Sequence, residues 1–166
     1  MRFTFPGVLV VWLALLGGVR PVPAQTRVLE GPSIDRFSRG SVRLTTVNFR
    51  KTEVTPGRSG LDVAIGFVPD YLGARTLLLH LDGGFAYAMP AGPATVLLKG
   101  GAAGFFGLGQ VHDFYPGLHV GLALVMPLQA RCNVRLELSR RYYYLTGEGA
   151  LPVWSMGVGL AVGSPH

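Results

Sequence analysis

Hydrophobic and polar positions alternate with a period of two between residues 117 and 144. In the first half, Leu118, Val120, Leu122, Leu124 and Met126 alternate with His119, Gly121, Ala123 and Val125. In the second half, Ala130, Cys132, Val134, Leu136 and Leu138 alternate with Arg131, Asn133, Arg135, Glu137, Ser139 and Arg141. Successive side chains of a β-strand point to opposite faces, so this pattern predicts two strands. The short connection at Pro127 predicts that they form a hairpin.

The same alternation predicts further strands over residues 41–49, 61–67, 77–89 and 94–106, and from residue 154 to residue 162. Residues 25–40 have no sustained period and are interpreted mainly as an irregular lead-in, and residues 50–60 as a loop. Seven strands result, whereas a single-chain bacterial barrel has an even number. An eighth strand arises if residues 82–84 form a turn, or if part of residues 26–40 pairs as a strand.

The first 24 residues predict a cleaved secretory signal peptide. Arg2 supplies a positive start, Val8 to Leu16 is apolar, and small residues stand at Val22 and Ala24, so cleavage is expected after Ala24. The apolar run is shorter than the ~20 residues that a membrane-spanning helix needs. An exported barrel domain is therefore expected over residues 41–163.

Charge and cysteine content narrow the function only slightly. The formal net charge is +6, and the basic residues are spread along the chain, which argues against a nucleic-acid partner. Cys132 is the only cysteine, so no internal disulfide can stabilise this exported chain. No cofactor is expected, and His112 with Asp113 provides too few ligands for a metal site.

The two faces of the expected strands differ in a way that favours a membrane barrel. One face carries Leu, Val and Met, and the other carries Gly and Ala, as at Gly157, Gly159 and Ala161. Small residues suit the crowded interior of a narrow closed barrel and are poor candidates for a water-facing surface. Aromatic residues gather at strand ends, where an interfacial girdle is expected. These are Phe105, Phe106, Tyr142, Tyr143, Tyr144 and Trp154.

With this strand pattern, the segments at residues 116–122, 140–144 and 154–160 resemble small bacterial outer-membrane β-barrels of the OmpA/OmpX-like kind. The resemblance implies an all-β fold, a single antiparallel up-and-down β-barrel of about eight strands. It also implies an outer-membrane location in a Gram-negative-type bacterium, surrounding outer-membrane lipid, and insertion by the barrel-assembly machinery. The family usually ends on an aromatic residue, whereas this chain ends Val162-Gly163-Ser164-Pro165-His166.

Charged residues on the Gly/Ala face are expected to form a paired network in the lumen, because a lone buried charge is costly. They are Asp62, His80, Asp82, Lys99, His119, Arg131, Arg135, Glu137 and Arg141. His80, His119 and Ser139 share this face, but no local motif links them as a catalytic site, so no enzyme is expected. Any specific ligand is expected on loops such as residues 107–116.

A soluble, lipocalin-like barrel is the alternative to the membrane barrel. In that case Leu118, Leu122, Leu136 and Leu160 would line an apolar ligand cavity. Arg131, Arg135 and Glu137 would then face water. The direction in which these side chains point therefore separates the two hypotheses.

Overall fold

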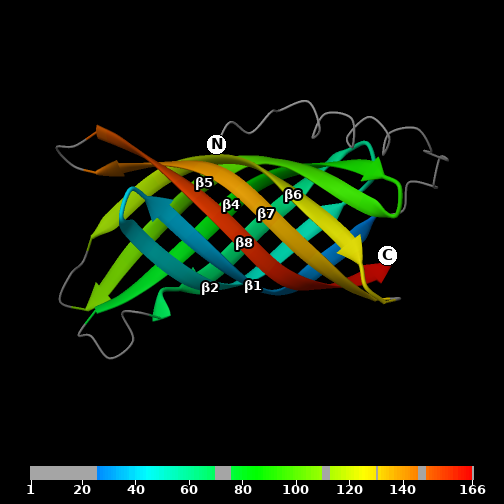
Figure 1. Cartoon of the computed structure of the whole chain (residues 1–166), viewed down its shortest axis with the longest axis horizontal. Coiled ribbons are helices and arrows are strands. Elements are labelled where there is room, and N and C mark those ends of the chain that lie inside the picture. The colour runs from blue at the N-terminus through cyan, green and yellow to red at the C-terminus, as the bar shows by residue number, and fades with distance from the viewer. Residues whose placement is uncertain (1–25, 70–75, 110–112, 130, 146–148, 166) are drawn as a thin grey trace, which may run out of the picture.

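The computed structural model of the protein describes residues 26–69, 76–109, 113–129, 131–145 and 149–165 (Figure 1). The signal peptide expected over residues 1–24 lies outside the described residues. The strands are β1 (Arg27–Arg39), β2 (Val42–Val54), β3 (Ser59–Phe67), β4 (Thr76–Ala91), β5 (Ala94–Gly109), β6 (Phe114–Pro127), β7 (Cys132–Leu145) and β8 (Gly149–Pro165). In the described ranges, no helix has the length and apolar character to cross a membrane.

The eight strands form one closed barrel. Each strand pairs antiparallel with the next in sequence, and β1 pairs with β8 to close the sheet. The all-β up-and-down barrel expected from the sequence is therefore confirmed. The strands wind obliquely around the barrel, as Figure 1 shows, and this tilt is what allows a sheet to close.

The expectation of an irregular lead-in at residues 25–40 was wrong, because most of this segment is β1. β1 supplies the eighth strand, and the proposed turn at residues 82–84 does not occur, since β4 continues through it. The strand was not predicted from the sequence because proline, here Pro32, is rare inside strands. The missing N–H of Pro32 is tolerated because the register of β1 with β8 omits Gly31 and Pro32.

Several strands are longer than the alternation indicated. β2 extends to Val54, so Arg50 lies in a strand rather than in the expected loop at residues 50–60. β5 and β6 leave only residues 110–113 between them, and β7 and β8 leave only residues 146–148. The connection expected at residues 107–116 is thus shorter than predicted.

The barrel has two different ends. We call the end with residues 26 and 165 and the turns at residues 55–58, 92–93 and 128–131 the terminal end. The other end, with the connections β1–β2, β3–β4, β5–β6 and β7–β8, is called the loop end. At the terminal end, Gly92 adopts a φ of 62°, which allows the short turn between β4 and β5.

Large apolar side chains cover the outside of the barrel. Phe85 is 68% exposed, Met156 67% and Leu122 41%. The inward positions of the same strands are buried, including Ala86, Ala123 and Ser155. This facing is the one that the membrane hypothesis requires, and the opposite of the one that a lipocalin-like barrel requires.

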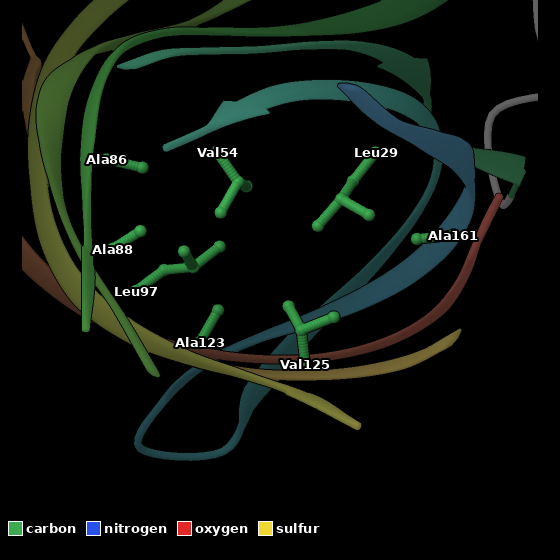
Figure 2. Packing of buried hydrophobic residues seen from close by; sticks show 8 residues of the cluster. All are labelled: Leu29, Val54, Ala86, Ala88, Leu97, Ala123, Val125 and Ala161. Carbon is green, nitrogen blue, oxygen red and sulfur yellow. The ribbon is translucent and has the colours of Figure 1, made fainter. Parts of the chain in front are cut away.

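Side chains fill the lumen in three layers. A terminal layer near the terminal end contains Leu29, Val54, Ala86, Ala88, Leu97, Ala123, Val125 and Ala161, which point toward one another across the barrel in Figure 2. An aromatic layer near the loop end contains Phe37, Val68, Ala103, Phe105 and Tyr143. Between them lies a layer of buried polar and charged residues, which positions the candidate site.

Candidate functional site

The polar layer is built from inward positions of strands all around the barrel. Four carboxylates and four basic side chains are buried there. The acidic residues are Asp35, Asp62, Asp82 and Glu137, and the basic residues are Arg50, Lys99, Arg135 and Arg141. The formal charges therefore balance, which is the condition under which buried charges are tolerated.

Asp82 is one centre of the network. Both of its carboxylate oxygens accept hydrogen bonds from Arg141, at 2.8 Å from Nη1 and 2.9 Å from Nη2. The Arg50 Nη2 atom donates to the same carboxylate at 3.0 Å. His119 Nδ1 lies 3.3 Å from Asp82 Oδ1, within ion-pair distance, but without the alignment of a hydrogen bond. The paired arrangement with Arg141 fixes both side chains in orientation as well as in charge.

Asp62 and Glu137 form the second centre, and Lys99 bridges them. The Lys99 ammonium lies 2.8 Å from Asp62 Oδ2 and 2.8 Å from Glu137 Oε1. Arg50 Nη1 also lies 2.7 Å from Asp62 Oδ2, and Arg135 Nη2 lies 3.1 Å from Glu137 Oε2. Each carboxylate in this centre therefore has more than one cationic partner.

Hydroxyl and amide groups complete the network. Asn48 donates to Asp35 at 3.2 Å, and its amide oxygen lies 3.0 Å from His80 Nδ1. Arg141 Nε donates to Ser155 at 2.8 Å, and its guanidinium carbon lies 5.0 Å from the centre of the Phe37 ring. These contacts link the polar layer to the aromatic layer.

Three buried polar atoms in one region have no hydrogen-bond partner: Ser33 Oγ, Arg50 Nε and Arg135 Nε. The same three residues line a small pocket of about 10 Å³. A cavity of this size has room for about one water molecule. It has no room for an organic substrate.

Apolar layers close the polar network off from both ends of the barrel. Phe105 packs against Phe37, His80 and Tyr143, with ring centroids 5.4, 4.9 and 5.1 Å apart. Ser139, which shares the lumen face with His80 and His119, donates to Glu137 at 3.1 Å and is 1% exposed. Among the described residues, the polar layer therefore provides structural ion pairing.

The structure places most of the expected lumen residues inside the barrel, and it corrects one of them. Buried in the lumen are Asp62, His80, Asp82, Lys99, His119, Arg135, Glu137 and Arg141. Arg131 is exposed in the β6–β7 turn and lines a hollow of about 250 Å³ at the terminal end. The prediction that Arg131 faces the lumen was wrong because β7 begins at Cys132, immediately after Arg131. The alternation of the strand therefore does not extend to Arg131.

Two of the expected interfacial aromatics are also wrong. Phe105 and Tyr143 are buried in the aromatic layer, at 7% and 5% exposure. Consecutive aromatic residues in a strand point to opposite faces, so a run of them cannot lie wholly at an interface. Tyr142, Tyr144 and Trp154 point outward, and Phe106 stacks on Phe114 with centroids 4.3 Å apart.

Asp35 and Arg50 also lie in the polar layer, although neither was among the lumen residues predicted from the sequence. Asp35 falls in the segment expected to be irregular, and Arg50 in the segment expected to be a loop. Period-two spacing from Ser33 to Asp35 and Phe37, and from Asn48 to Arg50 and Thr52, was the available signal. His112 lies outside the described residues, and those that are described include no group of three metal-ligating side chains.

Comparison with known proteins identifies the fold. No protein-family model matches the sequence, and no curated protein matches it in sequence. Among solved structures, it is similar to Neisserial surface protein A, with 12% identity, a TM-score of 0.55, and coverage of 82% of this chain and 96% of that one. A major outer membrane protein from Thermus thermophilus gives 12% identity, a TM-score of 0.57, and coverage of 84% and 99%.

The outer membrane protein OprG from Pseudomonas aeruginosa is similar at 10% identity, with a TM-score of 0.53 and coverage of 85% of this chain and 96% of that one. The resemblance to small outer-membrane β-barrels inferred from the sequence is confirmed for the fold. At these identities the likeness concerns the fold alone.

Proposed function

We propose that this chain is an outer-membrane barrel with a solid interior, serving as a structural or ligand-contacting element of the cell envelope and not as an enzyme or a channel. Outer-membrane lipid surrounds the barrel, and the barrel-assembly machinery inserts it. The observation that carries the proposal is the direction of the side chains, which is the opposite of that in a water-soluble barrel. Large apolar side chains lie outside, and a charge-balanced network lies inside.

The outward residues support membrane insertion because they form a continuous apolar surface. Leu118, Leu122, Leu136 and Leu160 are each more than 40% exposed, and in water such a surface would promote aggregation. In a bilayer the same surface meets lipid tails, and the closed sheet leaves no unpaired strand edge.

The closed interior supports the structural part of the proposal. A chain with this interior presents only its loops and its outer surface to other molecules. We therefore place any ligand contact at the loop end, where the connections between strands are exposed to the medium outside the cell in such barrels.

Placing a charge on the outer face tests the proposal. Leu122 lies on the outer face in the middle of β6, so Leu122→Arg is expected to oppose insertion by about 2–4 kcal/mol. Leu128 is 60% exposed but lies in the β6–β7 turn, so Leu128→Arg is the matched control and is expected to insert normally. The readouts are sedimentation with the outer membrane and gel mobility with and without boiling.

The proposal would be contradicted if the wild-type chain were soluble in the periplasm and its gel mobility did not depend on boiling. Equal behaviour of Leu122→Arg and the wild-type chain would do the same, because an aqueous outer face accepts an arginine at little cost.

A further inference from the structure

Given the membrane placement proposed above, we infer that the outer face of β7, β8, β1 and β2 near the loop end binds the phosphate groups of an anionic lipid in the surrounding leaflet. The binding residues are Arg36, Arg43 and Arg140, together with Trp154 and Tyr142. We call these five residues the arginine patch. All of them point outward, and Trp154 and Tyr142 are 49% and 40% exposed.

Strand register brings the patch together. Arg43 of β2 is paired with Ser38 of β1, Ser38 with Trp154 of β8, and Trp154 with Arg140 of β7. These residues form one row across four adjacent strands, and Arg36 lies two positions from Ser38 on the same face. Four strands span roughly 15 Å. The long arginine side chains therefore approach a single large headgroup from both sides.

The patch lies at the height of the aromatic layer, close to the loop end. Arg36 precedes Phe37 and Tyr142 precedes Tyr143, and both of these neighbours are buried in the aromatic layer. Arg43 and Trp154 are likewise next to Leu44 and Val153, which pack against that layer. This is the height at which headgroups meet a barrel, and where tryptophan and tyrosine are enriched.

The three arginines have no protein counter-ion in the part of the chain that the structure describes. Within the described strands, the outward-facing acidic residues are Glu30 and Glu53, and they lie at the other end of the barrel, next to Leu29 and Val54 of the terminal layer. The patch is therefore a concentrated positive charge on a face that meets lipid. The complementary ligand is a lipid with anionic headgroup oxygens.

Arg140 lies over two aromatic rings. Its guanidinium carbon lies 4.8 Å from the centre of the Trp154 ring and 5.8 Å from that of Tyr142. Stacking uses the face of the guanidinium and leaves its N–H donors in the plane free. A phosphate at the edge of the plane can accept two of them, which a carboxylate-paired arginine would not allow.

Lipid titration into the folded barrel tests the inference. Trp154 is the only tryptophan of the barrel once the expected signal peptide is removed, because the other tryptophan, Trp12, lies within residues 1–24. The barrel is placed in uncharged detergent and titrated with a diphosphorylated glycolipid, lipid A. Trp154 fluorescence reports on the patch, and native mass spectrometry counts bound lipid. We expect saturable binding of the lipid to the parent barrel.

The triple variant Arg36→Gln, Arg43→Gln, Arg140→Gln is expected to bind the lipid on the order of 100-fold more weakly, since each arginine contributes a factor of about five. The control variant Arg27→Gln, Arg58→Gln, Arg131→Gln loses the same charge from exposed positions at the terminal end. It is expected to bind like the parent barrel.

Three outcomes would overturn the inference: unchanged binding in the patch variant, an equal loss in the control variant, or an equal response to inorganic phosphate alone. The last would mean that the patch recognises free phosphate and not a lipid. Heat-dependent gel mobility is recorded for every variant. A parent chain that fails to insert refutes the proposed function, whereas an inserted patch variant that still binds lipid refutes only this inference.

Discussion

Most charged side chains in the lumen are held by several partners at once and take part in more than one ion pair. Arg50 approaches Asp62, Asp82 and Asp35, at 2.7, 3.0 and 3.6 Å. In a medium of low dielectric constant, removal of one member leaves its partners charged and unsatisfied. The cost of a substitution therefore depends on how many partners remain unpaired.

Asp82→Asn tests this at the carboxylate that both Arg141 and Arg50 contact through hydrogen bonds. Asparagine has nearly the same shape but no negative charge, so Arg50 and Arg141 are left with excess positive charge inside the barrel. We expect the free energy of unfolding to fall by about 3–5 kcal/mol. It is measured by urea titration of the barrel in vesicles, with the folded fraction read from unboiled gels.

Glu53→Gln is the matched control, because it also removes one carboxylate but at an exposed, outward position of β2. Its effect is expected to be within about 0.5 kcal/mol. Equal effects of the two substitutions would mean that the lumen charges are solvated, which contradicts a sealed polar layer.

Side-chain direction could be predicted from the sequence wherever strand alternation is uninterrupted. Alternation with a period of two places every second residue on the same face of the sheet, and this puts His80, Asp82 and Lys99 inside the barrel. The pairing within the network could not be predicted in this way. Arg135 donates to Thr52, 83 positions earlier in the chain, and only the closed register brings these two residues together.

At the scale of strands, the turn-like composition of one segment prevented the prediction of β1 from the sequence. Residues 31–33 read Gly-Pro-Ser, which in an ordinary sheet indicates a turn, yet they lie within β1. Pairing with β2 continues through these residues, and closure of the barrel pairs β1 with β8 on both sides of Gly31 and Pro32. The number of strands therefore followed from the even-number rule, while the position of the eighth strand needed the structure.

The pairing of β4 with β5 depends on two glycines that face each other. Gly84 is the register partner of Gly101, and a Cβ atom on Gly101 would lie 2.6 Å from Gly84 Cα and overlap the Gly83 carbonyl oxygen. Backbone atoms in a closed sheet cannot move aside easily. Gly101→Ala is therefore expected to lower the free energy of unfolding by about 1–3 kcal/mol.

Gly100→Ala provides the comparison at the adjacent position. The nearest atom to its new Cβ would be the His119 carbonyl oxygen, at 3.7 Å, which is ordinary contact. We expect this variant to match or slightly exceed the wild-type stability in the same urea titration. If Gly100→Ala were the more damaging of the two, the assigned facing of β5 would be wrong.

At the scale of the whole molecule, the barrel is a filled cylinder with a shallow hollow at each end. The hollow at the terminal end is lined by residues such as Arg27 and Arg131, and the one at the loop end by residues such as Phe37 and Leu151. The terminal, polar and aromatic layers separate them. Three successive layers make the seal independent of any single side chain.

This arrangement predicts that the reconstituted protein passes no steady current across a planar bilayer. Ions entering from the terminal end would meet Leu97 and Val125 first, and then basic and acidic groups already paired with one another. The double variant Leu97→Ala, Val125→Ala widens the terminal hollow but leaves the other two layers intact, so it is also expected to be non-conducting. Heat-dependent gel mobility of the same samples is the control, because it shows that a barrel that passes no current has nevertheless folded and inserted. A steady conductance in the double variant alone would mean that the terminal layer is the only seal, and that the ion-paired layer admits water.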